Sequence, residues 1–167
     1  MTGTGARHTI LVVDDHPLFR KGVVQLLELE PSFEVVGEAG DYDGALRLAS
    51  DKEPDLTLLD LHLKGSGGME ILAALKDVDP SRRVVMLTVS DAREDLMAAL
   101  RAGADGYLLK DMEPEELLDR VRGALEGRTV ISDSLSEALA DALRDEARGV
   151  RRDLRELTER ELAVLRC

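Results

Sequence analysis

The feature that most constrains the fold of this 167-residue chain is an alternation of short apolar runs with longer segments of helical periodicity. Four of these runs end in side chains capable of chemistry, namely residues 9–13 before Asp14 and Asp15, 56–59 before Asp60, 84–87 before Thr88, and 106–109 before Lys110. Short apolar runs of this kind are typical of strands buried on both faces of a parallel sheet. The alternation therefore predicts repeated strand–helix units.

The segments between the runs carry the spacing of amphipathic helices. In residues 19–27 the apolar positions fall at i, i+4, i+7 and i+8, and Pro17 suits a first helical turn because its missing N–H costs nothing there. The same spacing recurs in residues 117–125. With one further strand near residues 33–36, these units predict an α/β fold, a flavodoxin-like, doubly wound sheet of five parallel strands.

Three regions are expected along the chain. Residues 8–127 hold the sheet domain, and residues 128–156 form a linker with a helix at about 132–147. Residues 158–161 have the Thr-x-x-Glu pattern of a capping box, which marks the start of a further helix. Because the chain stops inside that helix, we expect residues 157–167 to be the truncated beginning of a second domain.

Composition disfavours several classes of function. The chain has a net charge of −12 and a pI of about 4.7, which makes its main body a poor surface for nucleic acid or an anionic membrane. A single cysteine, Cys167, leaves no internal disulfide and no cysteine-based zinc site. Without a signal peptide or an apolar run of membrane length, we expect a cytoplasmic protein that makes no membrane contact.

The polar residues that end the apolar runs are expected to meet at one edge of the sheet. Ligands of open parallel sheets bind outside the carboxyl ends of the strands, where three carboxylates, a hydroxyl and an ammonium would gather. Each residue taken alone has an ordinary role, since Asp15 could cap a helix and Lys110 could be solvated. Taken together, the carboxylates raise one another's pKa values and cost stability unless a cation balances them.

Mg²⁺ is the cation that suits this set, because it prefers oxygen ligands and is usually bound through one or two carboxylates plus phosphate oxygens. The predicted ligands are Asp14, Asp15, Asp60 and the backbone carbonyl of His62. The imidazole of His62 is more simply read as an exposed loop side chain, since its sequence neighbours are apolar or basic.

The phosphoryl group is expected on the protein itself. The chain lacks the G-x-x-x-x-G-K-[ST] loop that cradles nucleotide phosphates. A carboxylate can act as a nucleophile and form an aspartyl phosphate, and Asp60 is the best candidate. Mg²⁺ and Lys110 would neutralise charge on the phosphoryl oxygens, and Thr88 would donate a hydrogen bond to the product.

These residues also carry a resemblance to a known family. Residues 8–127 resemble the receiver domain of bacterial two-component response regulators in the order and spacing of Asp14, Asp15, Asp60, Thr88, Tyr107 and Lys110. The segments 13–17, 37–39 and 103–110 are similar to the NarL family, whose effector is a LuxR-type helix-turn-helix. Residues 110–115 are especially similar to its nitrate/nitrite-responsive members, and residues 157–161 resemble the opening of the effector.

The resemblance implies a role for each matching residue. Asp60 would receive a phosphoryl group from a sensor histidine kinase, Asp14 and Asp15 would bind Mg²⁺, and Thr88 and Tyr107 would form a switch pair. The protein would not turn over an external substrate, although self-catalysed phosphorylation and dephosphorylation of Asp60 are expected. In its full-length form it would regulate transcription, binding DNA through the missing C-terminal domain as a phosphorylation-dependent dimer.

Two residues depart from the family pattern. Lys64 stands where receivers usually have proline, four residues after the acceptor, and adds positive charge near the phosphoryl group. Val89 is bulkier than the small residue that usually follows the switch threonine, which would narrow access to the site. Both bear on how long a phosphoryl group would persist.

Two alternatives stay open at this point. A Mg²⁺-dependent phosphohydrolase with an aspartyl nucleophile would place a second Asp two residues after the first, but position 62 is His, and no cap domain is evident. A stand-alone receiver that acts by protein contacts only is disfavoured by the capping box at residues 158–161.

Overall fold

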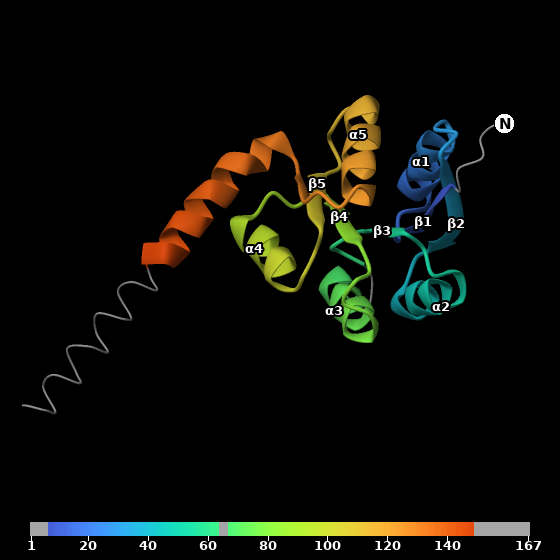
Figure 1. The fold of residues 1–167 in the computed structure, drawn as a ribbon, viewed down its shortest axis with the longest axis horizontal. Coiled ribbons are helices and arrows are strands. Elements are labelled where there is room, and N and C mark those ends of the chain that lie inside the picture. The colour runs from blue at the N-terminus through green and yellow to red at the C-terminus, as the bar shows by residue number, and fades with distance from the viewer. Residues whose placement is uncertain (1–6, 64–66, 149–167) are drawn as a thin grey trace, which may run out of the picture. The chain divides into compact units, whose positions relative to one another are not determined.

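A computed structural model describes residues 7–63 and 67–148, which fall into two compact units that divide between Ser132 and Asp133. The first unit is an α/β domain (Figure 1). Its strands are β1 (His8–Val13), β2 (Phe33–Ala39), β3 (Leu56–Leu59), β4 (Val84–Thr88), β5 (Gly106–Leu109) and β6 (Val130–Ile131). Its helices are α1 (Pro17–Glu28), α2 (Tyr42–Lys52), α3 (Gly68–Val78), α4 (Arg93–Arg101) and α5 (Pro114–Leu125).

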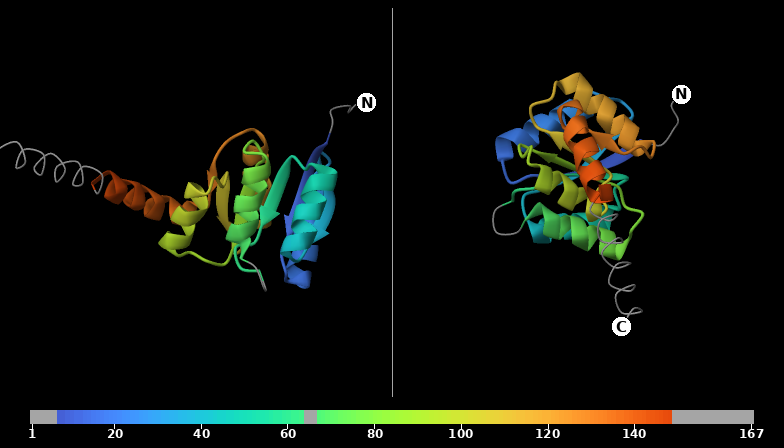
Figure 2. Two further views of the ribbon diagram at one scale, coloured as in Figure 1. Left: turned by 90° about the horizontal axis from the view of Figure 1, so that it is seen from below. Right: turned by 90° about the vertical axis from the view of Figure 1, so that its left-hand side faces the viewer.

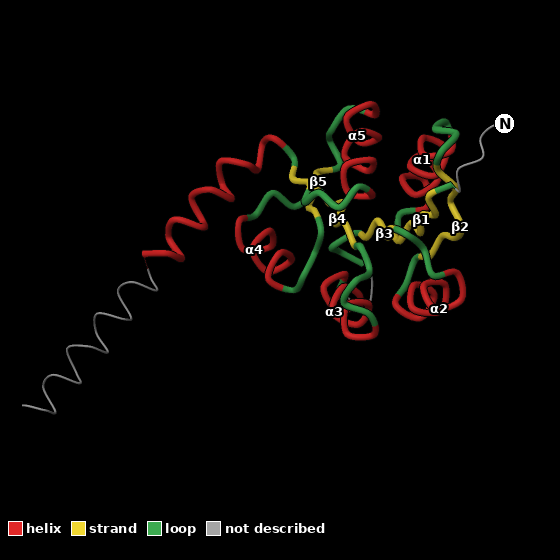
Figure 3. Tube along the Cα trace, in the orientation of Figure 1, coloured by secondary structure: helices red, strands yellow, loops and turns green. Residues whose placement is uncertain are grey.

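The strands form one parallel sheet in the order β2-β1-β3-β4-β5-β6 (Figure 3). The direction of winding reverses at β1, because the chain first moves outward to β2 and then returns to β3 on the other side. Helices α1 and α5 cover one face of the sheet, and α2, α3 and α4 cover the other (Figures 1 and 2). The predicted doubly wound, flavodoxin-like fold is confirmed.

The apolar runs of the sequence form the interior of this sheet. Every residue of β3, β4 and β5 is buried. On the face covered by α1 and α5, Ile10 and Val12 of β1 belong to the same packed cluster as Leu27 and Val121 of the two helices. Because these aliphatic side chains are held on both sides, the ends of the central strands are fixed in position.

The sheet has six strands where the sequence predicts five. The additional strand, β6, is two residues long and pairs with β5, which is too short a segment to show any periodicity. Gly106 of β5 permits this pairing, since a Cβ there would lie 2.5 Å from Cγ2 of Val130. The close approach of the two backbones is therefore what adds β6 to the sheet.

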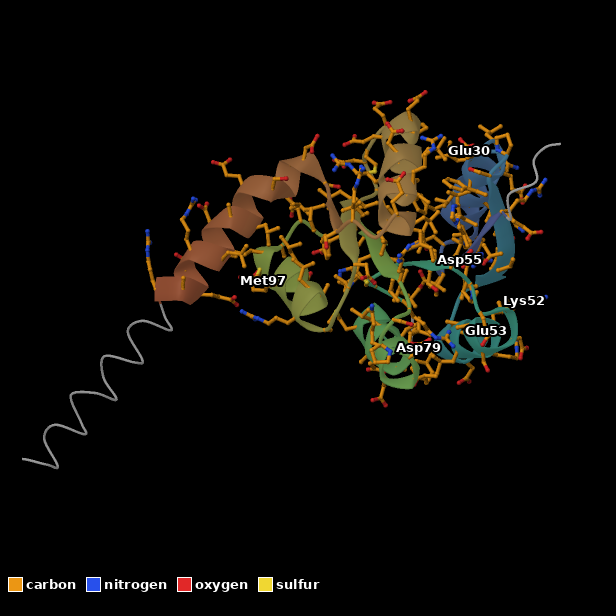
Figure 4. The ribbon with its side chains drawn as sticks, viewed as in Figure 1. Glu30, Lys52, Glu53, Asp55, Asp79 and Met97 are labelled. Carbon is orange, nitrogen blue, oxygen red and sulfur yellow. The ribbon has the colours of Figure 1, made fainter. Side chains whose placement is uncertain are left out.

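Charged side chains bond to the backbone at the edge where the strands begin, which we call the amino edge. Asp55 Oδ2 accepts a hydrogen bond from the N–H of Thr9 at 2.9 Å, and the Asp55 N–H donates to the Thr9 hydroxyl at 3.0 Å. Arg82 donates to the carbonyl of Ala49 in α2 at 3.1 Å. Figure 4 labels four acidic residues from the helix-to-strand connections of this edge, namely Glu30, Glu53, Asp55 and Asp79.

Lys76 has a similar structural role at the amino edge. Its Nζ donates to the carbonyl of Arg82 and lies 2.8 Å from Oδ2 of Asp105. The same Asp105 oxygen accepts a hydrogen bond from the N–H of Val84, the first residue of β4, at 2.9 Å. This ion pair therefore ties the end of α3 to the start of two strands, and only 14% of the Lys76 side chain is exposed.

The second unit contributes one described element, a helical segment at residues 133–148. The predicted linker helix at about 132–147 coincides with it, while the boundaries proposed for the linker and the effector stay predictions. Residues 149–156 of that linker and the expected effector start at residues 157–167 lie outside the described residues. Within residues 7–63 and 67–148, no helix combines the length and apolarity that a membrane span requires.

Candidate functional site

The opposite, carboxyl edge of the sheet gathers the acidic residues that follow β1 and β3. The N–H of Asp60 donates to the carbonyl of Val13 at 2.9 Å, so the strand pairing continues one residue past β3 and sets Asp60 beside Asp14. Gly68, the first residue of α3, packs so closely that a Cβ there would lie 2.1 Å from the carbonyl oxygen of Asp60. The backbone of Asp60 is thus held by close contacts on both sides.

One ammonium group lies between two of the carboxylates. Lys110 Nζ is 2.7 Å from Oδ2 of Asp14 and 3.3 Å from Oδ2 of Asp60. The Lys110 side chain is 10% exposed, and its ammonium also lies 4.3 Å from the centre of the Phe19 ring, within the range of a cation–π interaction. Its backbone N–H donates to the carbonyl of Thr88 at 2.9 Å, which extends the pairing of β4 and β5 to this residue.

The environment of Asp60 disfavours its charged form. Burial raises the pKa of this carboxyl above its ordinary value of 3.8, because the charged form loses its hydration. The positive charge of Lys110 acts in the opposite direction, and the negative charge of Asp14 raises the pKa further. The attraction of Lys110 therefore does not offset the cost of burying this carboxylate.

His16 is a member of this cluster that the sequence reasoning missed. Its Nδ1 lies 3.1 Å from Oδ1 of Asp14, 3.1 Å from Oδ1 of Asp15 and 3.9 Å from Oδ2 of Asp60. The only sequence signal was its place directly after the acidic pair, within the segment that carries the family resemblance. That signal says nothing about side-chain direction, which is set by the turn between β1 and α1.

Thr88 and Tyr107, the predicted switch pair, are both bonded to the same residue. Thr88 is fully buried, and its hydroxyl accepts a hydrogen bond from the N–H of Ser90 at 3.3 Å. The hydroxyl of Tyr107 donates to the carbonyl of Ser90 at 2.9 Å, and burial raises the pKa of this phenol to about 12. The hydroxyl of Ser90 in turn donates to Asp95 of α4. The two predicted switch residues are therefore joined through one loop residue.

The remaining predicted positions lie in the connections after β3 and β4. His62 is exposed, and its backbone N–H donates to Oδ1 of Asp60 at 3.3 Å. The predicted use of its carbonyl as a metal ligand stays a prediction. Lys64 lies outside the described residues, and Val89 is 74% exposed.

The donor set of this cluster is compatible with Mg²⁺. Asp14, Asp15, His16 and Asp60 each offer one potential ligand atom, and these four atoms lie within 4.8 Å of one another. Three of them are carboxylate oxygens, the ligands that hard divalent cations prefer. A divalent ion would also offset the negative charge of these carboxylates.

Comparison with known proteins identifies relatives of this chain. Residues 10–122 match the family model described as "Response regulator receiver domain". The chain is 46% identical over 158 residues to the nitrate/nitrite response regulator protein NarL of Escherichia coli K12, covering 95% of this chain and 73% of that protein. It is 47% identical over 157 residues to NarP of the same strain, covering 93% and 72%.

Solved structures give the same result. A two-component response regulator of the LuxR family from Aurantimonas sp. SI85-9A1 superposes with a TM-score of 0.78 at 34% identity, covering 82% of this chain and 98% of that chain. The signal receiver domain of a NarL response regulator from Mycobacterium tuberculosis superposes with a TM-score of 0.71 at 39% identity, covering 74% and 100%.

Proposed function

The chain belongs to the response regulator receiver domain family, and we propose that Asp60 accepts a phosphoryl group from a sensor histidine kinase in a Mg²⁺-dependent reaction. The observation that carries this proposal is the grouping at the carboxyl edge. A buried carboxyl of raised pKa lies 3.3 Å from the Lys110 ammonium and beside two further acidic residues. That environment suits a carboxylate that attacks phosphorus and becomes an acyl phosphate, whose added charge the neighbouring ammonium can offset.

The proposed transfer begins when a carboxylate oxygen of Asp60 attacks the phosphorus of the donor. The bond between phosphorus and the donor atom breaks as the new P–O bond forms, and the electron pair leaves with the donor. Lys110 is positioned to offset the charge on the phosphoryl oxygens, because it already contacts both Asp60 and Asp14.

Asp14, Asp15, Asp60 and the carbonyl of His62 are the groups that would hold Mg²⁺. When bound, the ion supplies positive charge that neutralises the phosphoryl oxygens. The carboxylate of Asp14 is 4% exposed and keeps its place through a 2.8 Å hydrogen bond from the N–H of His16. The chain thus offers a preformed anionic cradle for the cation.

Phosphorylation would act on the rest of the domain through Thr88 and Tyr107. A phosphoryl group adds about −1.5 to −2 charge and three strong acceptors, and the Thr88 hydroxyl would donate a hydrogen bond to it. That rearrangement would change the environment of Ser90, which also bonds to Tyr107. Moving a two-state domain from 1:99 to 99:1 requires about 5.5 kcal/mol of differential stabilisation.

In the whole protein, we propose that this change controls transcription through a LuxR-type helix-turn-helix and a phosphorylation-dependent dimer. The names of the NarL and NarP relatives support nitrate or nitrite as the stimulus sensed by the partner kinase. A phosphohydrolase activity has no comparable support, since position 62 carries an exposed histidine where that mechanism needs a second carboxylate. The cytoplasmic location expected from the sequence stays a prediction.

Intact-mass measurement tests the proposal directly. We expect the chain incubated with Mg²⁺ and acetyl phosphate to gain one phosphoryl group, and the gain to disappear with EDTA or with Asp60→Asn. Asp79→Asn is the matched control, because it makes the same chemical change to an acidic residue of the amino edge. Equal labelling of Asp60→Asn and the wild type would overturn the assignment, and turnover of a phosphomonoester beyond one equivalent per chain would favour a hydrolase.

A further inference from the structure

The imidazole of His16 lies at the acidic cluster, where its Nδ1 is 3.1 Å from Oδ1 of Asp14. His16 is the N-cap residue of α1, but its side chain makes no capping hydrogen bond to the helix. Its backbone N–H is instead bonded to Asp14 Oδ1, which fixes the start of the side chain next to the carboxylates. The side chain is 64% exposed, so a solvated ion can reach the ring.

The distances around Nδ1 fit a ligand shell as well as they fit hydrogen bonds. Two ligands at right angles around a metal with bonds of about 2.1 Å lie about 3.0 Å apart, and opposite ligands lie about 4.2 Å apart. Nδ1 is 3.1 Å from one oxygen of Asp14 and 3.1 Å from one of Asp15. Its 3.9 Å separation from Asp60 falls between the two ideal values. A cation could thus lie between the ring nitrogen and these oxygens.

The chemistry of the donors divides metal ions into two groups. Mg²⁺ strongly prefers oxygen ligands and dehydrates reluctantly, so it gains little from an imidazole. Borderline transition ions such as Zn²⁺ and Co²⁺ bind imidazole nitrogen well, and in mixed nitrogen and oxygen sites they bind more tightly than Mg²⁺. His16 would therefore matter for the second group and not for the first.

We propose that His16 Nδ1, together with Asp14, Asp15 and Asp60, forms a mixed nitrogen and oxygen site that binds a borderline divalent transition ion by direct imidazole ligation. The inference rests on the proposed function, because both use the same three carboxylates. It assigns to this site a second class of ligand, which would compete with Mg²⁺ for the cluster.

The test compares Co²⁺ and Mg²⁺ binding by titration calorimetry in the wild type, His16→Asn and His8→Asn. Asparagine is a favourable N-cap residue, so His16→Asn retains the start of α1, and thermal unfolding verifies that each variant is folded. His8 is an exposed residue at the beginning of β1 and serves as the matched control. Proton NMR of the Co²⁺ form adds a direct readout, since a metal-bound imidazole gives a strongly shifted ring N–H signal.

We expect His16→Asn to weaken Co²⁺ binding at least about tenfold and to change Mg²⁺ binding less than about twofold. The shifted ring signal should be present in the wild type and in His8→Asn and missing in His16→Asn. The inference would be overturned if His16→Asn lost affinity equally for both metals or kept its Co²⁺ affinity. It would also be overturned if His16→Asn bound Co²⁺ more weakly but the wild type never showed the ring signal. If the wild type binds neither metal and takes up no phosphoryl group, the proposed function itself fails.

Discussion

The two edges of the sheet use charge in opposite ways. At the amino edge, charged side chains bond to backbone groups, as Asp55 does with Thr9 and Arg82 with Ala49, or join an ion pair that also bonds to backbone, as Lys76 does. At the carboxyl edge, Asp14 and Asp60 both lie against the ammonium of Lys110. Both edges are built from the same alternation of strands and helices, so topology alone does not make a site.

The contrast shows what distinguishes a structural charge from a functional one. A charge bonded to a helix end or a strand start stabilises the fold and has little left to offer a ligand. Charges of one sign that are held together cost stability, and their shared field is available to an incoming cation or phosphoryl group. The amino edge should therefore respond to mutation in stability, and the carboxyl edge in chemistry.

The largest expected effect is on the rate of phosphoryl uptake, in the Lys110→Met variant of the carboxyl edge. The variant removes the ammonium that lies 2.7 Å from Asp14 and 3.3 Å from Asp60, so charge on the phosphoryl oxygens is no longer offset. We expect the initial rate of phosphoryl uptake to fall about 100-fold, as for loss of one preorganised donor in other enzymes. Time-resolved intact mass gives the rate. Uptake close to that of the wild type would mean that Lys110 is structural, like the lysine of the amino edge.

The next prediction concerns Lys76, the lysine of the amino edge. Lys76→Met removes the hydrogen bond to Arg82 and leaves Asp105 without its cation, so we expect the free energy of unfolding to fall by about 2 kcal/mol. Urea titration measures this loss. Phosphoryl uptake of the folded variant should equal that of the wild type, and a large loss of uptake would remove the distinction between the edges.

Asp60→Asn should change stability less than Lys76→Met does, and in the opposite direction. The pKa of Asp60 is raised in the folded state, so its ionisation costs stability as the pH rises from below 3.8 through the folded-state pKa. Without metal, we therefore expect Asn to stabilise the protein at neutral pH by on the order of 1 kcal/mol, and this gain to disappear in acid. Urea titrations across this pH range in EDTA measure the difference.

Asp79→Asn is the counterpart for the amino edge. Hydrogen bonds from Ser81 lower the pKa of Asp79, so this residue contributes stability above its unfolded pKa that is lost as the pH falls through the lower, folded value. The same substitution should thus stabilise at one edge and destabilise at the other near neutral pH. If Asp60→Asn and Asp79→Asn change the free energy of unfolding in the same direction near neutral pH, the proposed difference between the two edges is contradicted.

The smallest expected effect is a modest loss of phosphoryl uptake in Phe19→Leu. Leucine keeps the apolar volume but removes the ring that lies 4.3 Å from the Lys110 ammonium. A cation–π contact of about 0.5–1 kcal/mol corresponds to a loss of about threefold in phosphoryl uptake. Phe19→Tyr retains the ring and serves as the control. If Leu and Tyr behave alike, the ring does not position the lysine.

The sequence predicts the fold and most of the site because both depend on strand order. Buried runs that end in Asp14, Asp60, Thr88 and Lys110 must bring these residues to one edge once the sheet is parallel. Periodicity could not reveal β6, because two residues carry no period and their pairing depends on the space left by Gly106. The sequence also could not place His16, since its contacts depend on the turn that follows β1 rather than on any strand.

The junction at Ser90 has an evolutionary consequence. Its links to Thr88 and Tyr107 use the amide and the carbonyl of the main chain, which nearly every amino acid possesses. Substitutions at this position can therefore accumulate without severing the connection, although its hydroxyl bond to Asp95 would be lost. Proline, which lacks the amide hydrogen, is the replacement that selection should exclude.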